Sequence, residues 1–472
     1  MSNYKATIGI EVHVELKTKT KIFSNASNSY GSGANTLVNV VDLGYPGTLP
    51  TLNKEVIDQG IKTAILLNCN IRKKMHFDRK NYFYPDNPKN YQITQSRTPI
   101  GYDGYIEIEV DGKTKKIEIE EIHIEEDTAK SVHRKENTLL DFNRAGVPLI
   151  EIVTKPCIEN ALEAKLYLEK LKETLLYADI SDCKMEEGSM RCDANVSISK
   201  TDTLGVKCEV KNIGSISSVK EAIDYEINRQ TLILDNQEKL TEQTRRYDEK
   251  LKETILMRYK EKGNDYRYFP EPDIPFVLLT DKQIDDAKSS IPLMPDDRRR
   301  LYLEKGITLN SANKLILDKG ISDYFNEVLT EDMDVVVASN LLLGDIKAYL
   351  NTHEKQINET ELTQEKFKDL VHKISDDSLS SKNLKDILID IMESTSSIDE
   401  IIKSKGISNI TDVSYLEEII KKIISDNPEG VQDYKAGKDR AIKYLMGMIM
   451  KETKGSANPK LASALLEDLL KE

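Results

Sequence analysis

The sequence contains no tryptophan and no long apolar run. Of its 472 residues, 39% are hydrophobic and 31% are charged, which is typical of a globular protein that folds in water. No segment approaches the roughly 20 apolar residues that a membrane-spanning helix needs. The first residues also lack the apolar core of a signal peptide. We therefore expect a cytoplasmic protein with no membrane partner.

Cysteine is also scarce. The five cysteines, at positions 69, 157, 183, 192 and 208, are odd in number and form no C-x-x-C pair. Closely spaced pairs are typical of disulfide frameworks and zinc sites. The spacing therefore predicts reduced thiols and excludes a zinc knuckle.

Acidic residues exceed basic ones, and the formal net charge is −13. A charge of this sign usually disfavours a nucleic-acid partner. The distribution is uneven, however: residues 70–97 contain seven basic and two acidic side chains, and residues 433–460 contain seven and three. These two basic segments keep an RNA partner possible.

The length predicts two to four domains. Strand patterns and proline- or glycine-rich loops prevail up to about residue 290, whereas the remainder is polar and helical, with boundary-like residues near 395–406. We predict an α+β fold: a strand-rich mixed domain (1–290), an all-α domain (291–405) and a small α-helical tail (406–472). The basic residues of the tail lie on amphipathic helices, which suits either RNA binding or an ordinary helical bundle.

The first strand alternates between apolar and polar residues over positions 8–16. Because side chains alternate across a strand, Glu11, His13 and Glu15 share one face. An imidazole between two carboxylates can bind a metal or hold a shifted pKa. The simpler alternative is the wet face of a half-buried strand.

Two later strands carry acids in a similar way. A hairpin over 105–127 turns at Asp111-Gly112, and its apolar phase slips at 120–121, which predicts a bulge. Beyond the slip, His123 and Glu125 share the polar face, with Glu126 beside them. The strand 147–153 is apolar on both faces except at Glu151, and a buried carboxylate is costly without a cation or hydrogen-bond partners. Three acid-bearing strands predict a Mg²⁺ site.

Two further segments offer cations. Residues 77–89 interleave aromatic and basic side chains, including Lys80 and Tyr82, and Pro85 and Pro88 favour a structured loop over a helix. Such a loop suits a nucleotide or an RNA end, or it is an aromatic packing loop. A predicted strand at 206–212 places alternating lysines on one face, which suits either phosphate or solvent.

Several motifs resemble the GatB family, the B subunits of bacterial glutamyl/aspartyl-tRNA amidotransferases, over essentially the whole chain. The matching stretches are Gly9-Ile-Glu-Val-His-Val-Glu-Leu16, Tyr45-Pro-Gly47, Asp78-Arg-Lys-Asn-Tyr-Phe-Tyr-Pro-Asp86, His123-Ile-Glu-Glu-Asp127, Asn143-Arg144, Pro148-Leu-Ile-Glu-Ile-Val153, Met185-Glu-Glu-Gly-Ser-Met-Arg-Cys-Asp-Ala-Asn195, Asp265-Tyr-Arg-Tyr-Phe-Pro-Glu-Pro-Asp273 and, in a tail similar to YqeY, Lys451-Glu-Thr-Lys-Gly-Ser-Ala-Asn-Pro459.

The resemblance implies a glutamine-hydrolysing carbon–nitrogen ligase that uses ATP and Mg²⁺. Such an enzyme converts misacylated Glu-tRNA(Gln) or Asp-tRNA(Asn) to the correct amide by phosphorylating the side-chain carboxylate and substituting ammonia. The resemblance also implies a cradle-shaped catalytic domain and a tail that grips the tRNA. The partners would be an amidase-family A subunit that makes the ammonia and a small C subunit, and no DNA partner is expected.

Residue roles follow from matching positions. By this resemblance, the metal ligands would be Glu11, His13, Glu125 and Glu151, with Glu126 as an alternate. The residues that bind the nucleotide or the aminoacyl end would be Lys80, Tyr82, Arg191 and Lys207. Of these, the catalytic residues would be Glu125, Glu151, Lys80 and Arg191. Many family members carry paired cysteines after the first strand and before the Pro-Gly turn; none stand there in this sequence, so a structural zinc is not expected.

Two alternatives remain at this point. One is a non-catalytic scaffold that binds tRNA for a partner enzyme, although carboxylates near phosphate do not help a pure RNA binder. The other is a stand-alone amide ligase for a small carboxylic acid, which would have no use for a basic helical tail.

Overall fold

The computed structural model describes residues 4–259, 265–331, 333–376, 378–405, 413–435, 439–453, 457 and 459–471. The chain divides into two compact units, residues 1–294 and 295–472. All described strands belong to the first unit, and the second consists of helices. The predicted α+β class is therefore confirmed.

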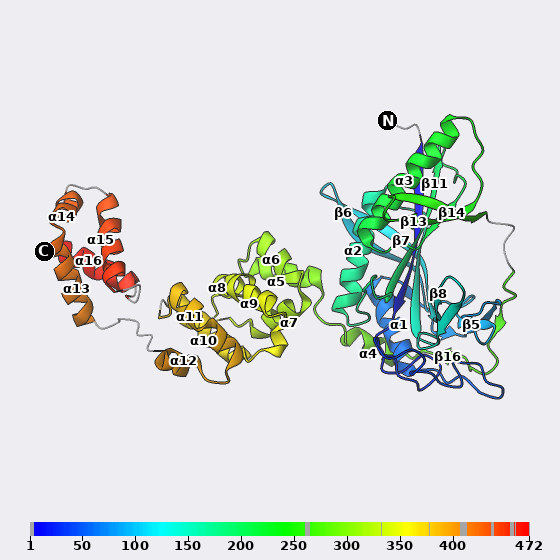
Figure 1. Ribbon diagram of the computed structural model, residues 1–472, viewed down its shortest axis with the longest axis horizontal. Helices are drawn as coiled ribbons and strands as arrows, with labels where there is room; N and C mark the ends of the chain where they lie inside the picture. Colours follow the sequence, from blue (N-terminus) through cyan, green and yellow to red (C-terminus); the bar gives the residue numbers. More distant parts are fainter. Residues whose placement is uncertain are drawn as a thin grey trace. The chain divides into compact units, whose positions relative to one another are not determined.

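A nine-stranded sheet forms the centre of the first unit (Figure 1). All neighbouring strands are antiparallel except β12 and β13, which are parallel. The spatial order is β14 (Glu253–Tyr259), β13 (Gln243–Asp248), β12 (Cys208–Lys211), β11 (Met190–Ser199), β1 (Lys5–Glu15), β10 (Pro148–Thr154), β7 (Lys113–Glu126), β6 (Gly101–Val110) and β2 (Asn70–Ile71).

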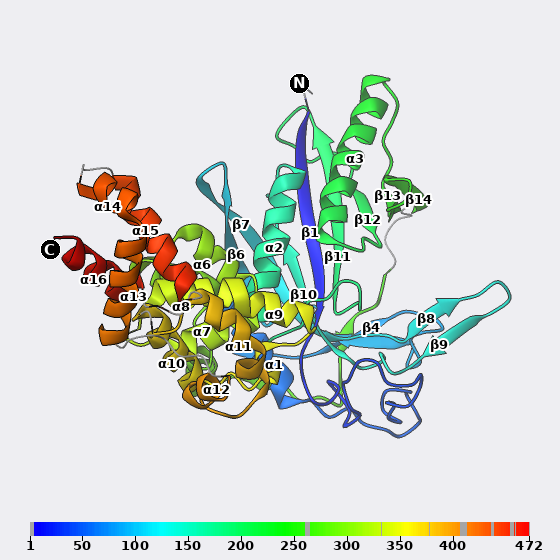
Figure 2. The same ribbon diagram turned by 60° about the vertical axis from the view of Figure 1, so that its left-hand side comes forward.

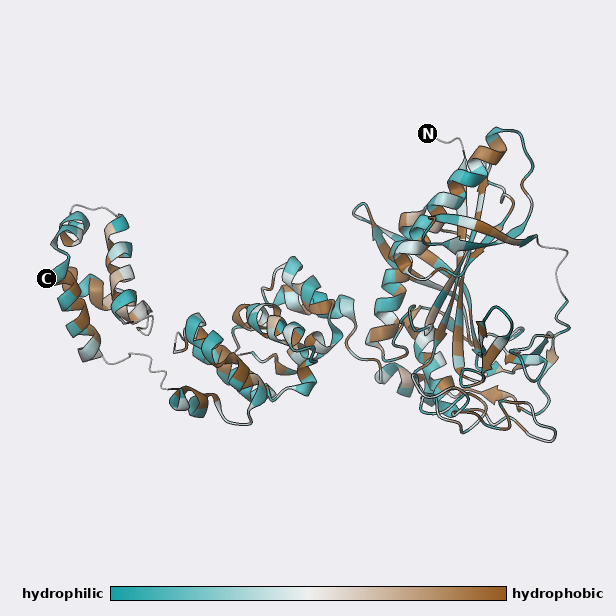
Figure 3. Cartoon of the chain, in the orientation of Figure 1, coloured by the Kyte–Doolittle hydropathy of each residue, from teal (hydrophilic) through white to brown (hydrophobic). Residues whose placement is uncertain are grey.

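One face of this sheet is apolar and is covered by helices. The side chains of Ile8, Ile10, Val12 and Val14 on β1 are fully buried. They share a hydrophobic core with α1 (Lys54–Leu66), α2 (Ala161–Tyr177) and α3 (Ile216–Asp235), and Figure 2 shows α2 and α3 beside the long strands. Because side chains alternate along a strand, the opposite face is left to the polar residues, an alternation that is visible in Figure 3.

The predicted hairpin and its bulge are confirmed. Strands β6 and β7 pair antiparallel, with Gly104 opposite Ile119 and Tyr102 opposite Glu121. Against β10, Thr154 pairs with Ile119 and Val153 with Glu121, so Glu120 is the extra residue. The bulge brings Glu121, His123 and Glu125 to the polar face.

The remaining short strands form three small sheets: β15 (Phe269–Pro270), β4 (Asp78–Asn81) and β5 (Tyr91–Thr94); β16 (Val277–Leu278) and β3 (Lys74–Met75); and β8 (Lys130–His133) and β9 (Thr138–Asp141). Of these strands, β5 lies against β7. The prediction of a loop over 77–89 was wrong at its start, because β4 pairs with both β5 and β15. Helix α4 (Asp281–Ser289) ends the unit.

The second unit begins at α5 with a run of short helices. These are α5 (Pro295–Glu304), α6 (Leu309–Ile316), α7 (Lys319–Val328), α8 (Val335–Leu341), the π-helical turn η1 (Leu342–Ile346), α9 (Lys347–Thr352), the 3₁₀ turn η2 (Ile357–Glu359), α10 (Gln364–Ser375), α11 (Ser381–Glu393) and α12 (Ile398–Ser404). Most begin at a Thr, Ser or Asp whose side chain accepts a hydrogen bond from a backbone N–H of the first turn.

Four helices make up the end of the chain: α13 (Val413–Asp426), α14 (Pro428–Lys435), α15 (Asp439–Glu452) and α16 (Pro459–Lys471). Leu416, Leu445 and Leu466 are among the fully buried residues of their common core. The predicted domain boundary at 405/406 adjoins residues 406–412, and part of the motif at 451–459 falls on 454–456 and 458; these positions lie outside the described residues.

Candidate functional site

Neighbouring strands place polar side chains side by side on the exposed face of the sheet. His13 on β1 is paired with Glu151 on β10, and Glu151 is paired in turn with His123 on β7. On the other side of β1, His13 is paired with Arg191 on β11. Adjacent strands are about 4.8 Å apart, so one row across four strands holds two imidazoles, a carboxylate and a guanidinium.

Glu125 lies two positions beyond His123 on β7, and its carboxylate converges with His13 and Glu151 of this row. The imidazole Nε2 of His13 is 3.5 Å from Oε1 of Glu125 and 3.7 Å from Oε1 of Glu151. One ligand atom from each of the three residues lies within 4.8 Å of the others. The Glu125 side chain is only 4% exposed, while those of His13 and Glu151 are 24% and 22% exposed. The cluster is therefore reachable from solvent although one carboxylate is buried.

The protonation of this cluster suits a metal ion. Burial, and then the neighbouring Glu151 carboxylate, raise the pKa of Glu125 to about 7, and burial is also the main reason that the pKa of Glu151 is raised. Burial, and then the positive charge of Arg191, lower the pKa of His13 to about 3. His13 is thus a neutral imidazole at pH 7, with a lone pair to donate. One imidazole nitrogen and two carboxylates fit a divalent cation, whose charge would offset the repulsion between the acids.

A segment around β5 holds Glu125 and His123 in place. The Thr94 hydroxyl donates to Oε2 of Glu125 at 3.2 Å, and the Gln95 carbonyl oxygen contacts Nδ1 of His123. His123 Nε2 is 2.8 Å from Oε1 of Glu121. Burial alone would lower the pKa of His123, but the hydrogen bond and charge of Glu121, followed by the charge of Glu151, raise it to about 9. His123 is therefore a cation at the edge of the cluster.

Lys80 on β4 and Tyr82, which follows the end of that strand, lie near the same acids. Burial of Lys80 would lower its pKa, but the charges of Glu125 and Glu151 are among those that outweigh it and raise the pKa. The Lys80 ammonium is 5.1 Å from the centre of the Tyr266 ring, and the rings of Tyr82 and Tyr266 are 6.3 Å apart. Both sequence-predicted residues thus lie at the rim of the acid cluster.

Arg191 is held on the opposite side of His13. Its Nη2 donates to Oδ2 of Asp127 at 2.6 Å, and Nε of Arg144 is 3.2 Å from the same oxygen. Nε of Arg191 is buried and has no hydrogen-bond partner among the described residues. Part of this guanidinium is therefore unsatisfied by the protein, which suits an anion-binding group.

Glu126 does not join the predicted metal ligands. Adjacent residues of a strand point to opposite faces, so Glu126 points away from Glu125. Both of its carboxylate oxygens accept hydrogen bonds from Nζ of Lys89, at 2.5 and 2.6 Å, and one also accepts from the Ile93 amide at 2.8 Å. The structure gives Glu126 a buried ion pair instead.

Glu11 belongs to a second group of acids. Its Oε1 accepts a hydrogen bond from Asn195 at 2.7 Å, and it converges with Asp193 and Glu209 rather than with His13. Glu11 lies two positions before His13 on β1, between the same two strands, and there its partner on β11 is Asp193. Lys211 offsets part of the charge of this second group, with Nζ at 2.5 Å from Asp193 and 3.0 Å from Glu209.

Lys207 lies away from both groups of acids. The predicted strand at 206–212 is shorter than expected, since β12 begins at Cys208, and Lys207 is exposed just before it. Lys211, rather than Lys207, is the lysine that lies on the polar face beside Asp193 and Glu209. Lys207 and Lys211 share the alternation of Glu209, so alternation did not separate them; the start of β12 at Cys208 does.

Sequence reasoning also missed Thr94 and the tyrosines 266 and 268. Thr94 carries no recognisable pattern, because its role depends on β5 lying beside the end of β7. Tyr266 and Tyr268 stand in a motif, Asp265 to Asp273, that the sequence singled out without giving it a role.

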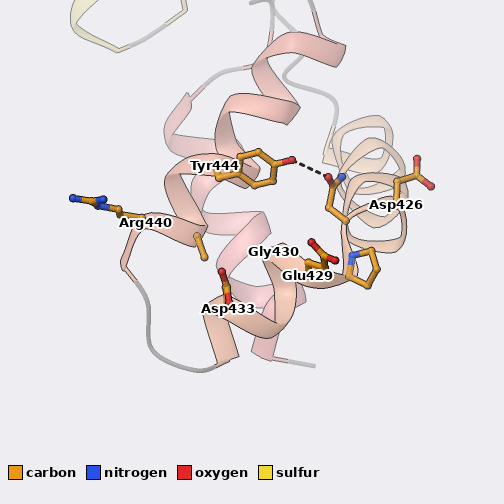
Figure 4. A pocket seen from close by; sticks show the side chains of 9 residues that line it. Asp426, Glu429, Gly430, Asp433, Arg440 and Tyr444 are labelled. Carbon is orange, nitrogen blue, oxygen red and sulfur yellow. Dashed lines mark hydrogen bonds between the residues drawn. The ribbon is translucent and has the colours of Figure 1, made fainter.

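A separate hollow of about 570 Å³ lies among the tail helices (Figure 4). Its wall includes Asp426, Glu429 and Asp433, and the Tyr444 hydroxyl donates to Asn427 at 3.3 Å. Figure 4 shows the Arg440 side chain pointing away from Tyr444. Three carboxylates make this hollow unsuited to phosphate.

In the part of the chain that the structure describes, every helix is either too short or too polar to cross a membrane.

Comparisons with known proteins agree with the motifs. Residues 6–285 match the model of the GatB/GatE catalytic domain, and residues 323–470 match that of the GatB domain. The chain is 47% identical over 468 residues to the B subunit of the aspartyl/glutamyl-tRNA(Asn/Gln) amidotransferase of Lysinibacillus sphaericus, covering 98% of both chains. It is 48% identical over 472 residues to the B subunit of the amidotransferase of the same name in Lactiplantibacillus plantarum, covering 99% of both.

Proposed function

The chain belongs to the family of aspartyl/glutamyl-tRNA(Asn/Gln) amidotransferase B subunits, and we propose that its acid cluster is where the side-chain carboxylate of a misacylated tRNA is converted to an amide. The substrates are Glu-tRNA(Gln), Asp-tRNA(Asn) or both. The observation that carries this proposal is the convergence of His13, Glu125 and Glu151 beside the Lys80 cation.

The reaction has two steps. A carboxylate oxygen of the substrate attacks the γ-phosphorus of ATP, the bond to the β-phosphate oxygen breaks, and ADP leaves. The nitrogen of ammonia then attacks the acyl carbon, phosphate leaves with its bonding electrons, and the nitrogen loses a proton to give the amide. Ammonia is not made on this chain in the proposal; it comes from glutamine hydrolysed by an A subunit, to which a small C subunit is joined.

The residues of the cluster divide this work. His13, Glu125 and Glu151 would hold a Mg²⁺ ion, and that ion, when bound, screens the charge between carboxylate and triphosphate. Lys80 holds a phosphoryl group from one side of the cluster, and the free part of the Arg191 guanidinium binds an oxyanion from the other. Tyr82 closes the rim next to Lys80 and excludes water from the acyl phosphate, which water would otherwise hydrolyse.

The test is amidation of Glu-tRNA(Gln) by the complete complex with ammonium chloride, ATP and Mg²⁺. Ammonium chloride bypasses the glutaminase, so only the step assigned to this chain is measured. We expect Glu125→Gln and Glu151→Gln to bind the tRNA normally but to lose amidation by about a hundred-fold or more. Glu107→Gln is the matched control, because Glu107 is an exposed acid on the same hairpin, 3.7 Å from Lys116.

Wild-type rates in both cluster variants would refute the proposal and favour the scaffold function, in which this chain only positions the tRNA.

A stand-alone ligase for a small acid is tested by removing residues 406–472. Loss of activity in that truncation supports a tRNA substrate, since a small-molecule ligase would not need the tail.

A further inference from the structure

A buried ion pair lies just beyond the end of β1 and has no part in the proposed chemistry. Nζ of Lys21, which follows β1, is 3.1 Å from Oδ2 of Asp42, in the loop that leads to α1. Their side chains are 0% and 2% exposed. Oδ2 of Asp42 also accepts a hydrogen bond from the Asn39 amide at 3.0 Å. Burying both charges costs free energy, because both groups lose their water, so the contacts of the pair call for an explanation.

The ion pair holds the turn at residues 142–147, which leads into β10. Nζ of Lys21 donates to the Phe142 carbonyl oxygen at 3.3 Å, and the backbone amide of the residue after Lys21 donates to the Gly146 carbonyl oxygen at 3.0 Å. Asp42 lies against Gly146: a Cβ atom at this glycine would be 2.7 Å from Oδ1 of Asp42. Gly146 also has a φ of +82°, a conformation that favours glycine. Hydrogen bonds and close contact together therefore fix the turn.

The same turn is connected to Arg191 through Asp127. The Gly146 amide donates to the Asp127 carbonyl oxygen at 3.0 Å. Nε of Arg144, in the middle of the turn, is 3.2 Å from Oδ2 of Asp127, the oxygen that accepts from Nη2 of Arg191 at 2.6 Å. The other oxygen, Oδ1, accepts from the Thr128 amide at 2.8 Å. One carboxylate oxygen thus lies between two guanidinium groups, and its place decides where Arg191 is held.

The simpler explanation is that the ion pair only stabilises the fold. Apolar side chains of similar size often replace a buried ion pair with no loss of stability, so stability alone is a weak reason for the charges. An ammonium that donates both to Asp42 and to the Phe142 carbonyl oxygen fixes a distance and a direction that apolar packing leaves free. This arrangement favours a positioning role.

We propose that Lys21 and Asp42 are positioning residues for the Arg191 guanidinium. The pair sets the turn, Arg144 in the turn sets the carboxylate of Asp127, and that carboxylate aims the guanidinium. Nε of this guanidinium has no hydrogen-bond partner in the described part of the chain. The inference rests on the proposed function in one respect, the binding of an oxyanion by Arg191, whereas the placement of the guanidinium is independent of it.

The test variant, made in the complete complex, is Lys21→Met/Asp42→Asn, which removes both charges but keeps the lengths of the side chains. Lys17→Met/Asp182→Asn is the matched control, because that pair is 3.2 Å apart and also close to the end of β1, but more than half exposed. Hydrogen exchange followed by mass spectrometry measures the placement. In the test variant alone, we expect the amides of 127–129 and 142–147 to exchange about ten-fold faster than in wild type, because the bonds that close the turn open more often.

Amidation with ammonium chloride measures the consequence for the reaction. We expect the test variant to lower kcat about ten-fold and to leave KM for Glu-tRNA(Gln) within about two-fold, since the oxyanion forms only as the reaction proceeds. Arg191→Lys should lower kcat as well. Combining it with the test variant should give no further loss, because the pair acts through that guanidinium. Losses that multiply would reveal a merely structural role and overturn the proposal.

Gly146→Ala provides a second variant in case the first does not fold. It keeps both charges but places a Cβ atom against Asp42, so the same changes in exchange and kcat are expected, and thermal unfolding shows which variants are folded. The proposal is overturned if exchange at 142–147 is unchanged in both variants, or if kcat is unchanged although Glu125→Gln is inactive. Because exchange does not depend on turnover, faster exchange in a complex whose Glu125→Gln variant amidates normally would refute the proposed function alone.

Discussion

His13 and Glu151 are paired directly across β1 and β10, with the imidazole Nε2 3.7 Å from the carboxylate oxygen Oε1. Both side chains are partly exposed to solvent, and Glu125 completes the group from the next strand. The backbone pairing of three long strands therefore fixes the relative positions of all three side chains. Positions that are set by a sheet vary less than positions on loops, which suits a metal-binding role.

His13 should contribute directly to divalent-cation binding. We expect His13→Ala to weaken Mn²⁺ binding, used here as a spectroscopic stand-in for Mg²⁺, by about ten-fold or more, because it removes one of three convergent ligands. The measurement is a Mn²⁺ titration followed by electron paramagnetic resonance. His133→Ala is the control, since His133 is exposed on β8 and its imidazole contacts Thr138 of the same hairpin. Equal affinities in wild type and His13→Ala would contradict the assignment.

Thr94 should act by positioning Glu125. Thr94→Val keeps the shape of the side chain but removes the hydroxyl that donates to Glu125 at 3.2 Å. We expect the Mn²⁺ affinity to fall by about ten-fold, the usual effect of losing a partner that orients a ligand, and Thr94→Ser to restore it. A drop in thermal stability without any change in Mn²⁺ affinity would show that Thr94 is only structural.

Glu126 should matter for stability rather than for the metal. Glu126→Gln leaves the buried Lys89 ammonium without its anionic partner, which costs about 3 kcal/mol of unfolding free energy. Mn²⁺ affinity should stay close to that of wild type, because Glu126 points away from the cluster. The double variant Lys89→Met/Glu126→Gln should recover most of the lost stability. A Mn²⁺ affinity that falls as far in Glu126→Gln as in Glu125→Gln would return Glu126 to the metal ligands.

Glu226 on α3 should make the first unit sensitive to acid. Burial of this carboxyl would raise its pKa, but hydrogen bonds from Arg229 and Gln230 outweigh burial and lower it. A lowered carboxyl pKa stabilises the folded state above the unfolded pKa, about 4.3, and this stabilisation is lost as the pH falls through the folded value. We therefore expect Glu226→Gln to cost about 3 kcal/mol at pH 7 and clearly less at pH 4.

Denaturant unfolding of the isolated chain at several pH values provides the measurement. Asp224→Asn is the control, because Asp224 lies on the same helix but its side chain is 49% exposed and pairs with Lys220 one turn away. A cost that is the same at pH 4 and pH 7 would mean that the ionised form of Glu226 does not stabilise the fold.

Much of the sheet could be predicted because alternation is a local property. The polar face of β1, the slip at Glu120 and the buried character of β10 all follow from which neighbours in sequence are apolar. The same property could have excluded Glu126, which has the opposite parity to Glu125. The motifs also pointed to the family, and the comparisons confirm that resemblance.

The ligand set could not be completed in this way. Separating Glu11 from the ligands requires knowing that β11 and β12 bring Asp193 and Glu209 to it. Preferring Lys211 to Lys207 requires the start of β12, which depends on pairing with β11 and β13. Thr94, Tyr266 and Tyr268 reach the site only through contacts between segments far apart in the chain.

The sequence by itself therefore determined the family, the α+β class and the face on which each strand carries its acids, because these depend on residue type and on the fixed alternation of a strand. Tertiary structure alone decided which of those acids meet. Strand order and register are set by long-range pairing, and a distance of a few ångströms between carboxylates on different strands is a property of that pairing.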